Sequence, residues 1–150
     1  MIIYADSSVL ARAYLADEPG HQDATALLSD PERPVITGSW SNVEVSGALV
    51  RAARASNRAH AVDEAGLLAA WDQDTAADGP LTVLRVPQEP VETLALELVR
   101  AHGLRAMDAW HLAAAATLAG MLSEPGETMV FASRDVEQRK VATLLGFDLL

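Results

Sequence analysis

Two aspartates, Asp6 and Asp135, follow short apolar segments that are rich in strand-forming residues. Asp6 comes directly after residues 2–5, and Asp135 comes shortly after residues 129–132. If both segments are strands of an open parallel sheet, the two carboxylates lie at its carboxyl-terminal edge, where such sheets bind ligands. Each aspartate could instead cap the next helix, because a carboxylate accepts the free amide protons of a first helical turn.

Asp108 is a third candidate because it lies near the start of a very apolar helix predicted over residues 106–122. A carboxylate in such surroundings is costly to bury unless it is paired, hydrogen-bonded or bound to a cation. A local partner, either Arg105 or His111, would give Asp108 a purely structural role. A metal ion would give it a catalytic one.

Glu44 is ambiguous when it is taken alone. Residues 41–44 match the Ser-x-x-Glu capping box, in which the serine and glutamate side chains each satisfy a free amide at a helix start. Glu44 could therefore serve only to begin the helix predicted over residues 40–55.

The composition and the missing motifs exclude several other kinds of chemistry. The chain has no cysteine, which excludes a disulfide framework, a thiol nucleophile and an iron-sulfur cluster. It also lacks glycine-rich phosphate loops, His-Glu-x-x-His and Gly-x-Ser-x-Gly, and its histidines do not have metal-ligand spacing. With 21 acidic and 11 basic residues, the net charge of −10 argues against sequence-independent coating of DNA.

Short apolar strands that alternate with helices would position these side chains. Strands are predicted over residues 2–5, 34–37, 81–86, 129–132 and 147–150. Helices are predicted from residue 7 through Tyr14 and over residues 21–28, 40–55, 57–75 (with Asn57 as a possible cap), 89–101, 106–122 and 136–145. Strands without polar alternation between helices indicate an α/β protein with a parallel sheet covered on both faces.

The length of 150 residues favours one domain over residues 1–150. The chain opens without a basic segment before Asp6, and its longest uncharged helical stretch, residues 109–123, is shorter than the roughly 20 residues that span a bilayer. We therefore expect a cytoplasmic protein that does not cross a membrane.

Four segments, taken in order, resemble the PIN domain family and most closely its VapC-type toxin ribonucleases. They are Ile3-Tyr4-Ala5-Asp6-Ser7-Ser8-Val9-Leu10, Val43-Glu44-Val45-Ser46-Gly47-Ala48-Leu49, Leu104-Arg105-Ala106-Met107-Asp108-Ala109-Trp110-His111-Leu112-Ala113 and Val130-Phe131-Ala132-Ser133-Arg134-Asp135. The third segment is the most specific of them. The chain departs from the family pattern between Asp108 and Asp135, where it is several residues longer than usual, with the surplus in residues 120–128.

The resemblance implies a three-layer α/β/α sandwich with a central parallel sheet and metal-dependent cleavage of RNA. It makes Asp6, Glu44, Asp108 and Asp135 an acidic quartet, with Ser133 beside the site. It also implies frequent homodimers and a cognate VapB-type antitoxin.

Four carboxylates without a soft ligand suit Mg²⁺ or Mn²⁺ better than zinc. We expect Asp6 and Asp108 to be direct ligands, Asp135 to complete the site or hold a second ion, and Glu44 to bind through water or orient the nucleophile. The candidates for holding RNA phosphates are Arg12, Arg51, Arg105 and Arg134.

Two alternatives remain open at this point. An aspartyl phosphatase would need a second aspartate two residues after Asp6, where this chain has Ser8. A catalytically silent PIN-like module that binds RNA or protein would keep the fold without the cleavage.

Overall fold

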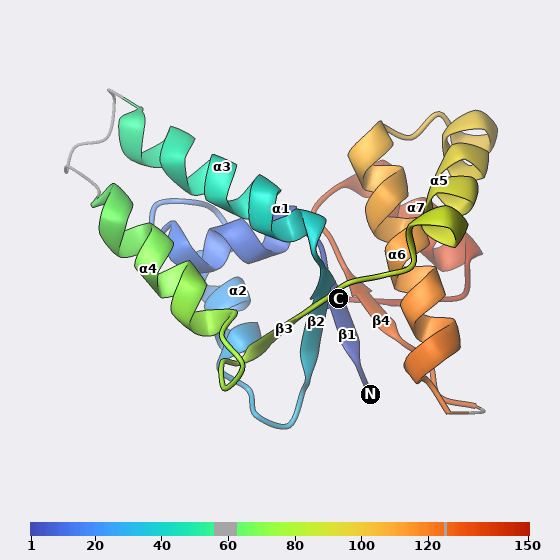
Figure 1. Ribbon diagram of the computed structural model, residues 1–150, viewed down its shortest axis with the longest axis horizontal. Helices are drawn as coiled ribbons and strands as arrows, with labels where there is room; N and C mark the ends of the chain where they lie inside the picture. Colours follow the sequence, from blue (N-terminus) through green and yellow to red (C-terminus); the bar gives the residue numbers. More distant parts are fainter. Residues whose placement is uncertain (56–62, 125) are drawn as a thin grey trace.

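One parallel sheet forms the centre of the computed structural model, which describes residues 1–55, 63–124 and 126–150. In the order of the chain, the strands of these described residues are β1 (Ile3–Ala5), β2 (Val35–Gly38), β3 (Leu81–Leu84), β4 (Val130–Ala132) and β5 (Asp148–Leu149). In space their order is β3-β2-β1-β4-β5, so β1 lies in the middle and β2 and β4 flank it (Figure 1). The carboxyl ends of these strands therefore meet at one edge of the sheet.

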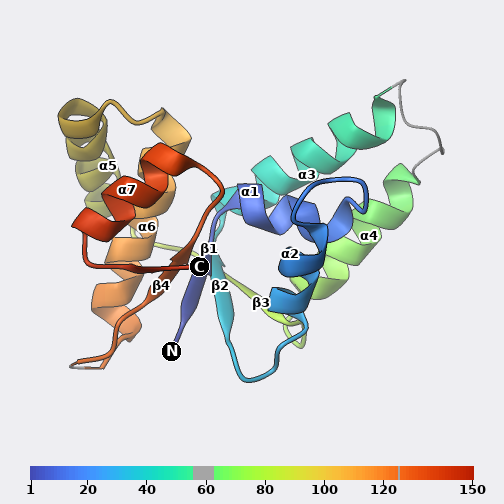
Figure 2. The same ribbon diagram turned by 180° about the vertical axis from the view of Figure 1, so that it is seen from behind.

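Helices connect the strands. They are α1 (Ser7–Leu10), the short 3₁₀ helix η1 (Ala11–Tyr14), α2 (His21–Leu28), α3 (Trp40–Arg54), α4 (Glu64–Asp74), α5 (Gln88–His102), α6 (Ala106–Leu122) and α7 (Val136–Leu144). Figures 1 and 2 show α5, α6 and α7 on one side of the sheet and α1 to α4 on the other. The predicted three-layer α/β/α sandwich is confirmed.

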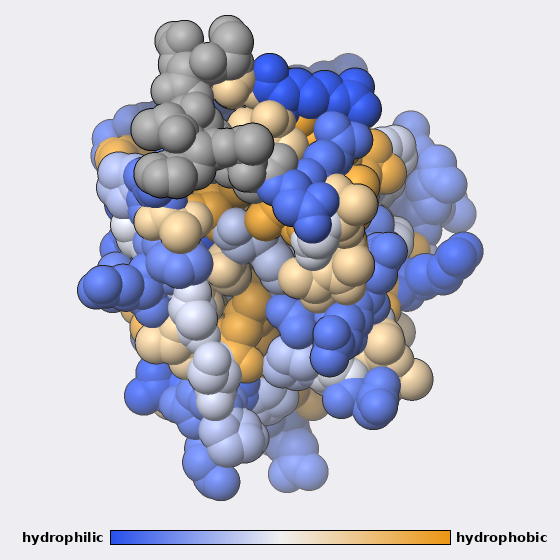
Figure 3. Space-filling view, turned by 90° about the vertical axis from the view of Figure 1, so that its left-hand side faces the viewer, coloured by the Kyte–Doolittle hydropathy of each residue, from blue (hydrophilic) through white to orange (hydrophobic). Residues whose placement is uncertain are grey.

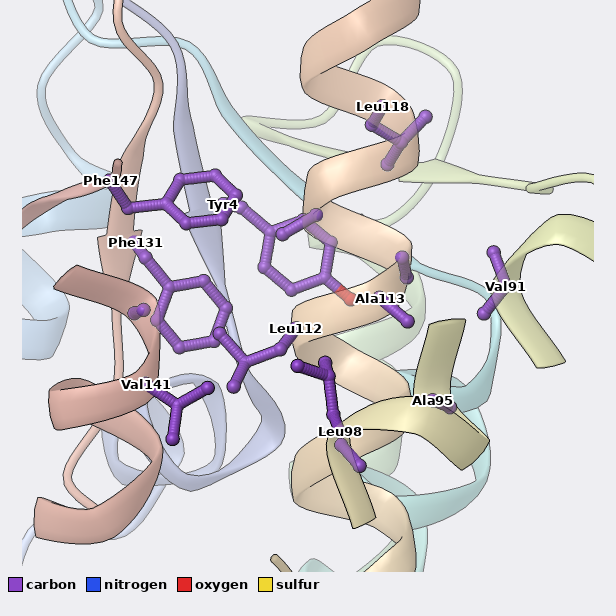
Figure 4. Close-up of a cluster of buried hydrophobic side chains, with 14 of the residues drawn as sticks. Tyr4, Val91, Ala95, Leu98, Leu112, Ala113, Leu118, Phe131, Val141 and Phe147 are labelled. Carbon is purple, nitrogen blue, oxygen red and sulfur yellow. The ribbon is translucent and has the colours of Figure 1, made fainter. Parts of the chain in front are cut away.

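The strand residues alternate between two hydrophobic cores, because successive side chains of a strand point to opposite faces. Tyr4 and Phe131 pack against α5, α6 and α7, as the close-up in Figure 4 shows. Ile3 and Ala5 pack against the α1 to α4 layer, where Trp71 is also fully buried. Both faces of the central strands β1, β2 and β4 are therefore buried, which explains why these strands show no polar alternation.

Most predicted boundaries lie within two residues of the observed ones. The bounds of α2 and α6 agree with the prediction, and Gly103 ends α5 in the left-handed conformation that a residue after a helix often adopts. The helix predicted from Asn57 is observed as α4, which begins at Glu64; Asn57 itself lies outside the described residues. The strand predicted over residues 81–86 is shorter and ends at Leu84.

The surface on the side of α3 and α4 is mostly hydrophilic around its rim, with a smaller exposed hydrophobic area in the middle (Figure 3). None of the helices in the described parts of the chain is long and apolar enough to cross a membrane.

Candidate active site

Asp6 lies at the carboxyl end of the central strand β1 and is almost fully buried, with 3% of its surface exposed. Its Oδ1 atom accepts hydrogen bonds from Ser8 Oγ at 2.7 Å and from the Val9 amide at 3.1 Å, so Asp6 caps α1 as well. Burial raises the pKa of Asp6, and hydrogen bonds from Ser8 and Ser133 offset only part of that effect. A buried carboxylate held in this way favours a cation nearby.

Asp108 and Asp135 lie at the same edge of the sheet and share one positively charged partner, the guanidinium of Arg105. Arg105 Nε donates to Asp108 Oδ2 at 2.8 Å, and Arg105 Nη2 donates to Asp135 Oδ2, also at 2.8 Å. Asp108 belongs to the first turn of α6, and Asp135 caps α7 by accepting from the Gln138 amide. Of the two local partners that the sequence offered for Asp108, the structure therefore shows Arg105 and not His111.

Gln138 connects the chain segments that carry these two aspartates. Its side chain is completely buried, and its Nε2 atom donates to the backbone carbonyl of Asp108 at 2.9 Å. Its Oε1 atom accepts from Ser133 Oγ, which in turn accepts from the Asp135 amide at 3.0 Å. The start of α7 is thereby fixed against the start of α6, and Ser133 lies beside the site as expected.

Glu44 makes its contact with His111 and not with its own helix start. The helix α3 begins at Trp40, and the hydroxyl of Ser41 is buried against Thr37. The capping box that Ser41 and Glu44 offered as an alternative role is therefore not formed. Glu44 Oε2 instead lies 2.5 Å from His111 Nε2 of α6. Burial opposes the ionisation of Glu44, but the hydrogen bond from His111 outweighs it and lowers the pKa of Glu44.

The four acidic side chains have separate partners at the carboxyl edge of the sheet. Asp108 and Asp135 share Arg105, whereas Glu44 is held by His111 and Asp6 by Ser8 and the Val9 amide. Among the described residues, no three His, Asp or Glu side chains are grouped so that they could hold a metal ion in this arrangement. One carboxylate oxygen of each of Asp108, Asp135 and Glu44 already has a partner on this chain.

Three of the four predicted substrate arginines, Arg12, Arg51 and Arg134, border two grooves. One groove, of about 450 Å³, is lined by Glu44, Arg12 and Arg51, together with Ser7 and Ser8. The other, also of about 450 Å³, adjoins Ser133 and is lined by the four arginines Arg12, Arg33, Arg134 and Arg139. Arg12 lines both grooves, and backbone carbonyls of Ser8 and Pro19 hold its guanidinium. Arg105 lines neither groove and instead bridges the two aspartates.

Sequence reasoning missed Gln138 and the role of Tyr4, which donates to or accepts from His111 Nδ1 at 2.9 Å. For Gln138 a signal was available, because Asp135 and Gln138 have the spacing of a helix cap followed by a polar third residue. For Tyr4 no local signal existed, since its partner lies 107 positions away. His111, which the sequence offered as a partner of Asp108, bonds Tyr4 and Glu44 instead.

Comparisons with known proteins bear on the family and the fold of the chain. The profile of the PIN domain family matches residues 3–144. Among solved structures, a chain of FitAcB from Neisseria gonorrhoeae superposes with a TM-score of 0.60, at 14% sequence identity, over 99% of this chain and 96% of that one. At this identity the likeness shows the fold alone. No curated protein sequence matches the chain at a significant level.

Proposed function

Because the chain belongs to the PIN domain family, we propose that it is a metal-dependent endoribonuclease of the VapC toxin type, which hydrolyses RNA phosphodiester bonds. Membership in the family supports nuclease activity. The observation that carries the finer proposal is that Asp6 and Asp135 follow the paired strands β1 and β4 at one sheet edge, where Arg105 bridges Asp135 to Asp108. Glu44 is held by His111 of the same helix as Asp108.

The chemistry of the donor set fits Mg²⁺ or Mn²⁺. The candidate ligands Asp6, Asp108 and Asp135 offer only carboxylate oxygens, which hard divalent cations prefer. A bound cation would activate water and neutralise the charge that develops on the phosphate. To serve as ligands, Asp108 and Asp135 would exchange their hydrogen bonds with Arg105 for bonds to the cation.

Glu44 and the arginines would act on the water and the substrate. Glu44 has a lowered pKa and is therefore ionised at neutral pH, so that it can accept a proton of the attacking water and orient it. The guanidinium groups of Arg12, Arg51 and Arg134 border the two grooves and would bind RNA phosphates. Arg105, once released from the aspartates, would be a fourth phosphate ligand, and Ser133 would contact the substrate beside Asp6.

The test is RNA cleavage by the purified protein with and without metal. EDTA should abolish the cleavage, and Mg²⁺ or Mn²⁺ should restore it. Asp6→Asn and Asp108→Asn should each lose most of the activity while the protein stays folded, because the substitution keeps the volume and removes the charge. Asp72→Asn, on the exposed surface of α4, is the matched control and should cleave as the wild type does. Cleavage that survives in EDTA would overturn the mechanism.

The proposal extends to the partners and location of the protein. We infer that residues 1–150 form one PIN domain, that the protein forms a homodimer, and that a VapB-type antitoxin restrains it in the cytoplasm. Such an antitoxin could place a basic side chain against the acidic cluster, where charge-assisted hydrogen bonds are strong. Light scattering on the isolated protein and copurification from the native host test the dimer and the antitoxin separately.

One observation favours a second candidate, a PIN module that binds RNA or protein without cleaving it. Arg105 already bonds both Asp108 and Asp135 and offsets part of their charge, as it would in a site that never takes up a cation. Binding of RNA without metal-dependent cleavage, together with an unchanged melting temperature in Mn²⁺, would favour this module over the nuclease.

A further inference from the structure

We propose that His111 is a positioning residue that holds the Glu44 carboxylate in place for catalysis, and that Tyr4 fixes the His111 ring in the tautomer this requires. The inference rests on the proposed ribonuclease function. It starts from a continuous path of hydrogen bonds that crosses the interior from β2 to α3. Along this path Gly38 contacts Tyr4, Tyr4 contacts His111, and His111 contacts Glu44.

The direction of each hydrogen bond follows from its neighbours. The Gly38 amide donates to Tyr4 Oη at 3.3 Å and so uses one lone pair of the phenol oxygen. The hydroxyl keeps its proton at neutral pH, since the ordinary pKa of a tyrosine is about 10. Tyr4 therefore donates that proton to His111 Nδ1 at 2.9 Å. The imidazole proton is then on Nε2, where it is donated to Glu44 Oε2 at 2.5 Å.

The surroundings of Tyr4 keep this arrangement rigid. Its ring is stacked on Phe131, with centroids 5.7 Å apart and planes 6° apart, and it meets the edge of His111 at 6.0 Å. Figure 4 shows the Tyr4 ring in the core with its hydroxyl directed towards α6. A Cβ atom at Gly38 would lie 3.1 Å from that hydroxyl oxygen, so a glycine at this position gives the oxygen enough space.

The position of His111 explains why it can control Glu44. Glu44 is on α3 in one helical layer, whereas His111 is on α6 in the other layer, one turn after Asp108. His111 is 2% exposed and cannot turn away to water, while Glu44 remains partly exposed in its groove. The imidazole thus holds the Glu44 carboxylate of α3 at a fixed position relative to Asp108 of α6. Metal-ligand and catalytic carboxylates depend on such outer partners for their orientation.

The tautomer can be measured without any cleavage assay. A long-range ¹H–¹⁵N spectrum of the metal-free protein should show His111 with its proton on Nε2. Tyr4→Phe removes the hydroxyl that fixes Nδ1, and the spectrum should then show a mixture of tautomers or a charged ring. A wild-type spectrum with the proton on Nδ1 would overturn the inference.

A double-mutant cycle tests whether His111 acts through Glu44. His111→Leu should lower kcat by roughly 10-fold to 100-fold, the usual effect of losing such a partner, with little change in KM. His111→Gln keeps an N–H that can reach Glu44 and should recover part of the loss. If His111 acts through Glu44, then His111→Leu combined with Glu44→Gln should be no slower than Glu44→Gln alone.

The controls separate this inference from the proposed function. His102→Gln, on an exposed histidine at the end of α5, should leave both the rate and the His111 signal unchanged. If wild-type protein does not cleave RNA in Mg²⁺ or Mn²⁺, the proposed function fails, while the tautomer still reports on the His111–Glu44 contact. If wild-type protein cleaves RNA and the two substitutions are additive, or if His111→Leu cleaves normally, the function stands and the role of His111 is refuted.

Discussion

Arg105 and Asp135 are joined by a 2.8 Å hydrogen bond although 30 positions separate them in the chain. The same guanidinium also bonds Asp108, so one exposed arginine offsets part of the repulsion between two carboxylates. Asp135 thereby lies next to Asp108 in spite of the longer stretch between them. The arginine also occupies the carboxylate oxygens that a divalent cation would use, which makes it a competitor of that cation.

Arg105→Gln should therefore bind Mn²⁺ several-fold more tightly than the wild type, because the cation no longer displaces a guanidinium. Isothermal titration of the metal-free proteins measures this directly. The melting temperature should change little, since exposed ion pairs contribute little to stability.

Arg100→Gln, on the exposed end of α5, is the matched control for the loss of one positive charge. This variant should have the same Mn²⁺ affinity as the wild type. Equal affinities for the wild type and Arg105→Gln would show that Arg105 does not compete for the carboxylates.

Local signals in the sequence were sufficient to predict much of the fold. The bounds of α2 and α6 follow from apolar runs and from the residues that flank them, which act over one or two turns. The end of β3 was not predictable in this way. It ends at Leu84 because its partner β2 supplies only four paired residues, from Val35 to Gly38. A strand end depends on a neighbour that the local sequence does not contain.

The same distinction holds for the candidate site. Asp6 and Asp135 could be selected because each follows a strand, and the structure brings both to the carboxyl edge of the sheet. The partner of Glu44 could not be found locally, since His111 is 67 positions away. The nearest local pattern, with Ser41, led to a capping box that does not form.

Asp6→Asn should raise the melting temperature of the metal-free protein at neutral pH. Burial raises the pKa of Asp6 from its ordinary value of 3.8, so its protonated form favours folding. That contribution is complete below pH 3.8 and is lost as the pH rises through the raised pKa. Asparagine stays neutral and still caps α1, so its advantage should vanish below pH 3.8. Thermal unfolding between pH 3 and 8 checks this, and an Asp6→Asn variant less stable than wild type at pH 7 would contradict it.

Glu44→Gln should show the opposite pH dependence. His111 lowers the pKa of Glu44 below its ordinary value of 4.5 in spite of burial, so the ionised form favours folding. Its contribution is present above pH 4.5 and is lost as the pH falls through the lowered pKa. The variant should melt below wild type at neutral pH, and the two curves should converge in acid. Curves that stay parallel over this range would mean that the charge of Glu44 does not stabilise the fold.

Gln138→Ala should destabilise the protein by about 1–3 kcal/mol, the cost of leaving buried polar groups without a partner. The groups affected are Ser133 Oγ and the carbonyl of Asp108, both of which bond the Gln138 side chain. For a domain of this size, the loss corresponds to a fall of about 2–12 °C in melting temperature. Gln22→Ala, on an exposed position of α2, is the matched control and should change little. Equal melting temperatures for the two variants would show that Gln138 does not fix α7 against α6.

Mn²⁺ should stabilise the wild-type protein, because a cation that binds only the folded site shifts the equilibrium towards it. At a hundredfold excess over Kd the gain is about 2.7 kcal/mol, which raises the melting temperature by about 5–11 °C. Asp108→Asn should shrink this shift, since it removes one of the proposed ligands. It should not raise the melting temperature without metal, because Arg105 already compensates Asp108 in the folded protein. Asp72→Asn should keep the full shift, and an Asp108→Asn variant that also keeps it would remove Asp108 from the proposed metal site.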